Sequence, residues 1–408
     1  MQMERNIKYN KISYWLSIVC FAFGLSWLSQ LLISFVLGNN FFEPFLVIAF
    51  FFIIASRHPV GNILKKSLQS KSFLIFFLII SIFGLIGFFN SGYDFMSVYG
   101  DYRVNLLFIF TILFFLSKKW TDSVKEKFII HLFIVISIFD VLALTLRPYL
   151  WIESTKQNIG IIIPAVLAVY YMRKNKYLYS FIFTAILSYD AILSFFRKNY
   201  LFAMIIFVII FVLFLQNLAK GKTNIKNKMK SMFLIFSIII VGLYSSDAVY
   251  SYWMSNESKM IHSIVRTEEL LSGDSEEVER KNSLLVILNY PERLLFPQGL
   301  GWRAFIDDVE KEFRDLHIVS SMDSSPFYIG YHYGIIILVF LFFIAVKHIF
   351  YAFFQRDKFK GAYIFNKMVR IAFFGIFCIS FFTESVMFTL SQAAFAYATL
   401  YSLILKPI

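Results

Sequence analysis

A pair of cations, Arg197 and Lys198, interrupts an apolar stretch of the sequence, SFFRKNYLFAM from Ser194 to Met204. The apolar runs on both sides are long enough to cross a membrane, so we expect the pair at a membrane surface. A guanidinium group is always charged, and its planar fork matches phosphate oxygens in a bidentate manner that an ammonium group lacks. The pair therefore indicates a site for an anionic group at the end of a span.

The composition determines which elements position this pair. Hydrophobic residues make up 59% of the 408 residues, charged residues only 16%, and the mean hydropathy is +0.68. A soluble globular chain of this length does not carry such values. A span needs roughly 17 to 25 apolar residues with its backbone polar groups satisfied internally, which favours helices. We predict an all-α polytopic membrane protein with about twelve transmembrane helices.

The predicted spans group into a transmembrane bundle over residues 1–247, a polar segment over 248–325 and C-terminal helices over 326–408. The first span is too long for the core of a secretory signal and lacks a small-residue cleavage site, so we expect it to be retained. The second, fourth and last three spans also fit tilted or re-entrant segments. The predicted spans are 12–37, 41–56, 72–89, 104–117, 128–146, 158–172, 177–193, 199–217, 231–247, 326–346, 369–383 and 391–405.

The distribution of basic residues predicts the orientation, because short cytoplasmic loops are enriched in lysine and arginine. With both termini in the cytoplasm, lysine divides 21 inside to 5 outside, whereas arginine divides 5 inside to 8 outside. Lysine follows the rule and arginine does not, so we expect anionic partners at the outer face. Any single arginine fits an ion pair with a loop carboxylate or a lipid head group equally well. The outer arginines are Arg103, Arg147, Arg197, Arg266, Arg280, Arg293, Arg303 and Arg314.

The polar segment 248–325 is far longer than any other connection, which predicts a subdomain on the outer face. Its 14 acidic and 8 basic residues give a net charge of −6, so its arginines do not belong to a general basic surface. Within it, DSEEVERKNSLLVILNYP predicts a helix that Pro291 ends, with Arg280 in its early turns. Gly299 and Gly301 in LLFPQGLGW predict a tight turn or a close backbone approach.

The segment re-enters the membrane through residues 320–334, which begin with SSMDS and continue with SPFYIGYHYG. This order places Asp323 near the outer interface, together with His317. Asp323 is a candidate proton acceptor, and it also suits the N-cap of a helix that begins at Ser324 to Pro326. Tyr328 follows closely and could stack on a sugar, although an interfacial belt of aromatic residues explains it more simply.

The order of these features resembles the O-antigen polymerase and O-antigen ligase superfamily. The resemblance covers about Ser194 to Phe343 and rests on SFFRKNY, on RKNSLLVILNYPERLLFPQGLGW and on the stretch from Asp323 to Leu338 that ends in SPFYIGYHYGIIIL. It implies a GT-C-like architecture and an inverting, metal-independent glycosyltransferase whose donor and acceptor are glycans linked to undecaprenyl diphosphate. Where the family often has a His-Asn pair, this chain reads MDSS, which favours a polymerase over a ligase and leaves the proton acceptor open.

The resemblance also implies roles for individual residues. Arg197 matches the arginine of the span-entry motif and Arg280 the arginine at the head of the loop helix, and both would contact the diphosphate. Asp323 stands in the place of the His-Asn pair, so the predicted catalytic residues are Arg280, Arg197 and Asp323. The residues predicted to bind the diphosphate or the glycan are Arg266, Arg303, Lys198, His317 and Tyr328.

The expected location is the bacterial inner membrane, with the site facing the periplasm and with the lipid bilayer and a chain-length regulator protein as partners. We expect no cofactor, no metal and no nucleic-acid partner, because the six histidines show no paired ligand spacing and the net charge of +13 comes mostly from cytoplasmic lysines. Two other functions fit the sequence, an O-antigen ligase and a lipid-linked glycan flippase. A flippase would use intramembrane charges such as Asp140 and Asp190, although each more simply lies near a span end or hydrogen-bonds to a neighbouring helix.

Overall fold

The structure is a computed structural model. It describes residues 11–26, 28, 29, 32, 51, 53, 55, 59–90, 95–117, 120, 122–146, 161–194, 197–219, 295–301, 325–354, 367–383 and 391–404. Within them every regular element is a helix and none is a strand, which confirms the predicted all-α class.

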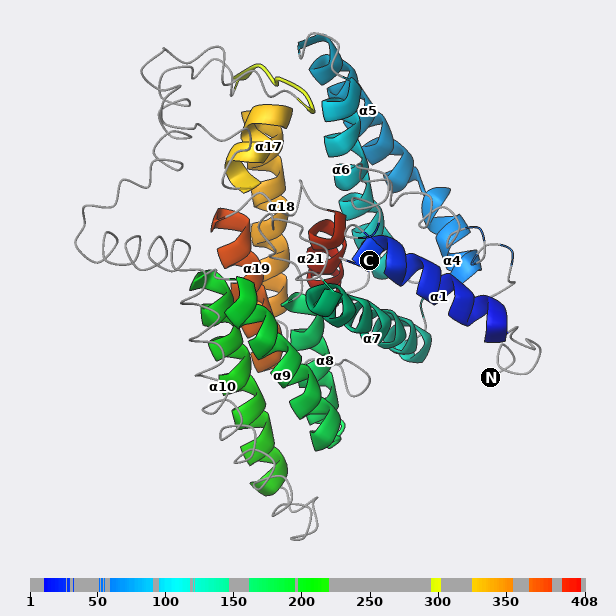
Figure 1. Cartoon of the computed structure of the whole chain (residues 1–408). Coiled ribbons are helices and arrows are strands. Elements are labelled where there is room, and N and C mark those ends of the chain that lie inside the picture. The colour runs from blue at the N-terminus through cyan, green and yellow to red at the C-terminus, as the bar shows by residue number, and fades with distance from the viewer. Residues whose placement is uncertain are drawn as a thin grey trace.

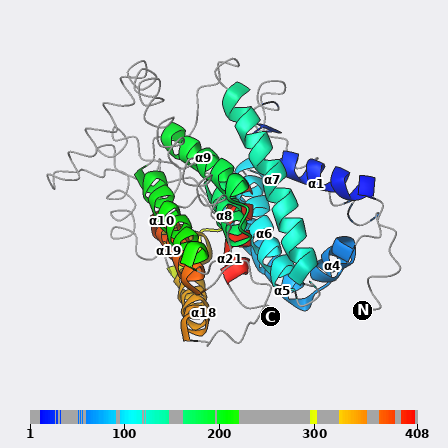
Figure 2. The ribbon, with the colours of Figure 1, turned by 90° about the horizontal axis from the view of Figure 1, so that it is seen from below.

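The helices of this part of the chain are α1 (Lys11–Leu25), α4 (Pro59–Leu68), α5 (Lys71–Asn90), α6 (Phe95–Leu116), α7 (Asp122–Leu146), α8 (Ile162–Arg173), α9 (Tyr177–Ser194), α10 (Arg197–Ala219), α17 (Ser325–Tyr333), α18 (Ile335–Phe354), α19 (Lys367–Thr383) and α21 (Ser391–Ile404). Figure 1 shows α5 and α6 as an antiparallel pair, and α10, α19 and α18 lie side by side in Figures 1 and 2.

Two of these helices, α5 and α6, are long and apolar enough to cross a membrane, and α1, α8, α9, α10, α18 and α19 contain shorter apolar stretches. The side chains of α5 that point away from the bundle are large and apolar, and between half and two thirds of the surface of each is exposed: Leu74, Ile75, Leu78, Ile82, Leu85 and Phe89. A row of this kind is unfavourable in water.

Several boundaries differ from the predicted spans: α7 begins at Asp122 rather than at residue 128, and α18 ends at Phe354 rather than at residue 346. The helix α6 begins at Phe95 rather than at residue 104, because its polar first turns pack against the segment 295–301. The single predicted span 326–346 is two helices, α17 and α18, which meet at Gly334 with a φ of +87° that glycine adopts readily. The helix α4 lies in the predicted cytoplasmic loop. The predicted span 231–247 lies outside the described residues, as do all but three residues of 41–56.

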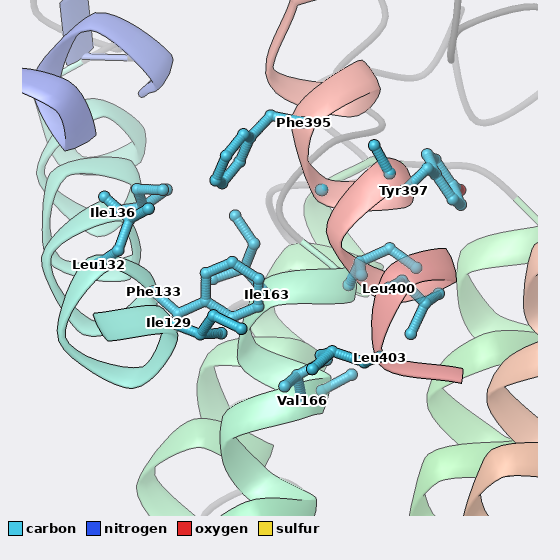
Figure 3. Close-up of a cluster of buried hydrophobic side chains, with 14 of the residues drawn as sticks. Ile129, Leu132, Phe133, Ile136, Ile163, Val166, Phe395, Tyr397, Leu400 and Leu403 are labelled. Atoms are coloured by element: carbon cyan, nitrogen blue, oxygen red, sulfur yellow. The ribbon is translucent and has the colours of Figure 1, made fainter. Parts of the chain in front are cut away.

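The core lies where α7, α8 and α21 meet (Figure 3). Phe133 and Ile136 lie one turn apart on α7, and both are fully buried. Ile163 on α8 and Leu400 on α21 are also fully buried. Such recurrence at three and four residues gives a helix one packing face. The alanines of α21 are also buried, and small side chains let neighbouring helices approach closely. This packing holds α21 against α6, α8 and α19.

A buried polar pair joins α7 to α21. Gln392 Nε2 donates a hydrogen bond of 2.8 Å to Asp140 Oδ2, and the two side chains are 0% and 4% exposed. Of the two explanations for Asp140 considered from the sequence, the hydrogen bond to another helix is confirmed. The side chain of Asp190 lies outside the described part of α9.

Replacing Gln392 with leucine is expected to lower the free energy of unfolding by about 1 to 3 kcal/mol, because the buried Asp140 carboxyl loses a donor. Thermal unfolding of the purified protein in detergent measures the change. The double variant with Asp140→Leu is the control, since it replaces both partners with apolar groups and is expected to recover part of the loss. A wild-type melting temperature for Gln392→Leu would contradict a stabilising role for the pair.

Candidate functional site

The structure describes three of the eight predicted site residues. Arg197 and Lys198 are the first two residues of α10, although their side chains lie outside the described part, and Tyr328 belongs to α17. The other five predicted site residues lie outside the described residues: Arg266, Arg280, Arg303, His317 and Asp323.

The elements that carry Arg197 and Tyr328 pack on different neighbours. The helix α10 packs on α8 and α9, whereas α17 packs on α5 and α18, and both contact α19. Figure 1 shows α19 between α10 and α18. Arg197 and Tyr328 therefore belong to helices that pack mainly on different neighbours. The helix α19 contacts both of these helices.

The glycine turn, residues 295–301, occupies the junction of α5, α6 and α17. Gly299 and Gly301 have φ values of +82° and +74°, a conformation that side chains with a Cβ rarely adopt. Figure 1 shows this segment in yellow between α17 and the tops of α5 and α6. The turn predicted from the two glycines is thus confirmed.

Backbone hydrogen bonds attach the glycine turn to two helices. Gln298 N donates to Tyr331 O at 3.0 Å and Gly299 N to His332 O at 3.1 Å, both on α17. Leu300 N donates to Phe83 O of α5 at 2.9 Å. This last bond requires the turn to touch the backbone of α5.

The approach to α5 and α6 is close enough to exclude side chains. A Cβ on Gly87 would overlap the backbone of Leu300, and a Cβ on Gly301 would overlap the backbone of Val98. The close backbone approach expected for the turn is therefore confirmed at two helices. Leu300, between the glycines, is fully buried.

A polar network at the start of α6 completes the attachment. Gly301 N donates to Asp101 Oδ2 at 2.9 Å. Tyr328, 2% exposed, accepts through its hydroxyl a 3.0 Å bond from Asn105 Nδ2, which also donates to the Asp101 carbonyl at 2.8 Å. Asp101 and Asn105 share a helix face because they are four residues apart. Asp101 thus ties α6 to the glycine turn, and Asn105 ties the same helix to α17.

A second tyrosine of α17 differs from Tyr328 in its hydrogen bonding. Tyr333 is also buried, and its ring packs edge-on against Phe83 at a centroid distance of 4.9 Å. Within the described residues its hydroxyl has no hydrogen-bond partner. The two tyrosines therefore form a matched pair in which only one hydroxyl contributes to the network.

Replacing Tyr328 with phenylalanine is expected to destabilise the protein by about 1 to 3 kcal/mol, because the Asn105 amide loses a buried partner. The same change at Tyr333 removes an unsatisfied buried hydroxyl and is expected to be neutral or stabilising. Melting temperatures of the two variants, measured side by side in detergent, test the difference. Equal losses in both variants would contradict the network.

Asp101 and Asn105 are absent from the residues predicted to form the site. Asp101 stands just ahead of the predicted span 104–117, where hydropathy alone assigns no helix, and Asn105 is the second residue of that span. Two polar residues four apart just before an apolar run were the available signal. Tyr328 was predicted, but its ring is enclosed by protein in this structure, and a contact with a glycan stays a prediction.

Among the described residues, no three His, Cys, Asp or Glu side chains come together in a way that could hold a metal ion. Comparison of the chain with protein-family models, with curated proteins and with solved structures found no match. The resemblance drawn from the sequence motifs therefore stays a prediction.

Proposed function

We propose that this chain is a membrane glycosyltransferase that polymerises oligosaccharide repeat units carried on undecaprenyl diphosphate into an O-antigen or capsule-type polysaccharide. The glycine turn is the observation that carries the proposal. Gly299 and Gly301 belong to the motif on which the family resemblance rests, and their positive φ values and close packing give that motif a specific structural task. The turn ends two residues before Arg303, one of the residues predicted to bind the diphosphate or the glycan.

A location in the bacterial inner membrane is part of the same proposal. It is supported by the apolar length of α5 and α6 and by the exposed apolar side chains of α5 and α18. Contact of these apolar side chains with lipid costs no free energy, whereas their contact with water is unfavourable. The distribution of lysines supports cytoplasmic termini, and the long polar segment then faces the periplasm.

The proposed reaction joins two lipid-linked glycans. A hydroxyl of the acceptor glycan attacks the anomeric carbon of the donor, the glycosidic bond forms with inversion, and the bond to the diphosphate breaks with its electron pair on the leaving oxygen. Arg197 and Arg280 stabilise that charge, and Asp323 accepts the hydroxyl proton. Arg266, Arg303, Lys198 and His317 bind the diphosphate or the glycan.

Deletion of the gene in its native host tests the proposal, with the surface glycan displayed on a gel. A polymerase predicts that the ladder collapses to a single repeat and that the wild-type gene restores it. Loss of all surface glycan would overturn the proposal. Polymers that accumulate on the outer face would then indicate a ligase, and single repeats trapped inside would indicate a flippase. Polymer formation by the purified protein in detergent, where transport cannot occur, separates an enzyme from a flippase.

A further inference from the structure

We propose that the connection between α8 and α9, residues 173–176, binds the phosphate groups of anionic phospholipids at the cytoplasmic surface of the membrane. We call this connection the basic turn, because it consists of Arg173, Lys174, Asn175 and Lys176. The inference rests on the membrane location that is part of the proposed function. It does not depend on the proposed reaction.

The basic turn presents its charged residues to the outside of the bundle. All four of its residues are exposed. The backbone N–H groups of Lys174, Asn175 and Lys176 donate to carbonyl groups in the last turn of α8, at 2.9 to 3.1 Å. Asn175 closes the turn with a φ of +57°, a left-handed conformation that asparagine adopts more readily than most residues. The backbone therefore caps α8, and the charged side chains are not required for that task.

Two contacts place the basic turn at one end of the bundle, where α8, α9 and α10 lie side by side (Figures 1 and 2). Lys174 Nζ lies 3.0 Å from Glu126 Oε1, near the start of α7. Asn217 Nδ2, near the end of α10, donates a 3.0 Å hydrogen bond to Met172 O of α8. The distribution of basic residues predicts that all three of these helix ends are cytoplasmic. In that orientation the basic turn faces the anionic inner leaflet.

The positive charge around the basic turn exceeds the negative charge. Glu126 pairs with Lys174, whose side chain nevertheless remains 52% exposed. The Lys176 ammonium lies over the Tyr179 ring, 6.0 Å from its centroid, and no carboxylate of the described residues forms an ion pair with it. Lys127, next to Glu126, is also exposed. One described carboxylate thus accompanies Lys127 and the three cations of the turn, which leaves a positively charged surface.

Four tyrosines indicate the depth of the basic turn in the membrane. Tyr170 and Tyr171 precede the turn, and Tyr177 and Tyr179 follow it. The rings of Tyr171 and Tyr179 lie 5.2 Å apart, and the Lys174 ammonium lies 5.6 Å from the centroid of the Tyr170 ring. Tyrosine is enriched at the level of the lipid head groups, because its ring is apolar and its hydroxyl is polar. The cations of the turn therefore lie at the depth of the lipid phosphates.

Exposed apolar side chains lead away from the basic turn along α9 and α10. Leu178, Ile182 and Tyr189 share one face of α9 and are between 44% and 56% exposed. Eleven residues of helix span about 16 Å, roughly half of the ~30 Å hydrocarbon core and thus the depth of one leaflet. A phospholipid matches both the charge and these rows, whereas a soluble partner would leave the rows uncovered. The exposed row of α10 consists of Leu201, Met204, Val208, Phe211 and Leu215.

Titration of the full-length protein in detergent with phosphatidylglycerol tests the inference, with bound lipid counted by mass spectrometry of the intact protein. Phosphatidylcholine with the same acyl chains has no net charge and is expected to bind at least about 10-fold more weakly. Lys176→Gln is expected to weaken phosphatidylglycerol binding about 5-fold, and Lys174→Gln with Lys176→Gln about 25-fold, as for the loss of one and two cations near an anionic surface. Lys174→Arg with Lys176→Arg retains both charges and is expected to bind like the wild type.

Glu126→Gln is expected to act in the opposite direction. It removes the carboxylate that competes with lipid for Lys174, and it is expected to strengthen phosphatidylglycerol binding about 5-fold. Lys65→Gln with Lys66→Gln is the matched control, because it removes two exposed lysines from α4, which packs on α5 and α6. This control is expected to change the affinity less than about 2-fold, since distant sites act independently.

Equal affinities for phosphatidylglycerol and phosphatidylcholine would overturn the inference, and so would equal losses in the α4 control and in the double variant of the basic turn. Inorganic phosphate is the remaining probe. If phosphate alone raises the melting temperature as much as phosphatidylglycerol does, the ligand is a soluble phosphate compound and the inference is wrong. These results leave the proposed function standing if the purified enzyme makes polymer. Absence of polymer together with preserved lipid binding would instead overturn the proposed reaction and leave the inference standing.

Discussion

Replacing Arg280 or Arg197 with alanine is expected to slow polymer formation by about 100- to 1,000-fold. In the proposed reaction the leaving diphosphate gains negative charge in the transition state, and a guanidinium held in place would lower the energy of that charge far more than mobile water does. Initial rates with the purified variants and lipid-linked repeats measure the effect, and the length of the surface glycan in complemented cells reports it in vivo.

Two control variants separate the role of these arginines from general loss of positive charge. Arg314 belongs to the same polar segment and has no assigned role, so Arg314→Ala is expected to retain nearly wild-type rates. Arg280→Lys keeps the charge but loses the planar fork, and an intermediate rate is expected. Glycan chains of normal length with both Arg280→Ala and Arg197→Ala would show that the diphosphate binds elsewhere.

Replacing Gly301 with alanine is expected to cause the largest loss of stability. Alanine at a φ of +74° costs about 1 to 3 kcal/mol in backbone strain, and overlap of its Cβ with the Val98 backbone costs about 1 to 3 kcal/mol more. The α6 backbone cannot yield without moving Asp101, which follows Val98 within one turn. Lower melting temperature and lower yield in detergent would register the change.

Gly100 provides the control for this prediction on the same helix. It lies in α6 between Val98 and Asp101, and a Cβ there would meet nothing within 4 Å. Gly100→Ala is therefore expected to leave stability unchanged or to raise it by up to about 1 kcal/mol, since alanine favours helix over glycine. A wild-type melting temperature for Gly301→Ala would refute the close packing of the turn.

Several helices follow directly from the sequence. The spans predicted at 72–89, 177–193 and 199–217 correspond to α5, α9 and α10 within two residues at each end. These helices are apolar runs flanked by polar residues, and a run of that length satisfies its own backbone hydrogen bonds without help from the rest of the chain. For the same reason the all-α class was predictable.

The turn at Gly299 and Gly301 was predictable, since paired glycines indicate a left-handed backbone. The helices that this turn contacts were not predictable. Its partners on α5 and α6 are Phe83, Gly87, Val98 and Asp101, about 200 residues earlier in the chain. No local pattern specifies which helix a turn will meet. The arginines of the candidate site are therefore predictions from the sequence alone, whereas Asp101 became visible only through its contact with Gly301.

The helices of this protein thus follow from short segments of its sequence, whereas the contacts between the helices follow from long-range packing. Apolar length and the distribution of lysines and arginines are properties of short segments, and from them the sequence specifies the helices and predicts the orientation and the anion-binding chemistry. Polar groups such as Asp140 and Asp101 follow a different rule, because their partners lie on other elements of the chain. The pairing of Asp140 with Gln392, the start of α6 at Phe95 and the attachment of the glycine turn to Asp101 all depend on which helices lie side by side, and that arrangement exists only in the folded chain.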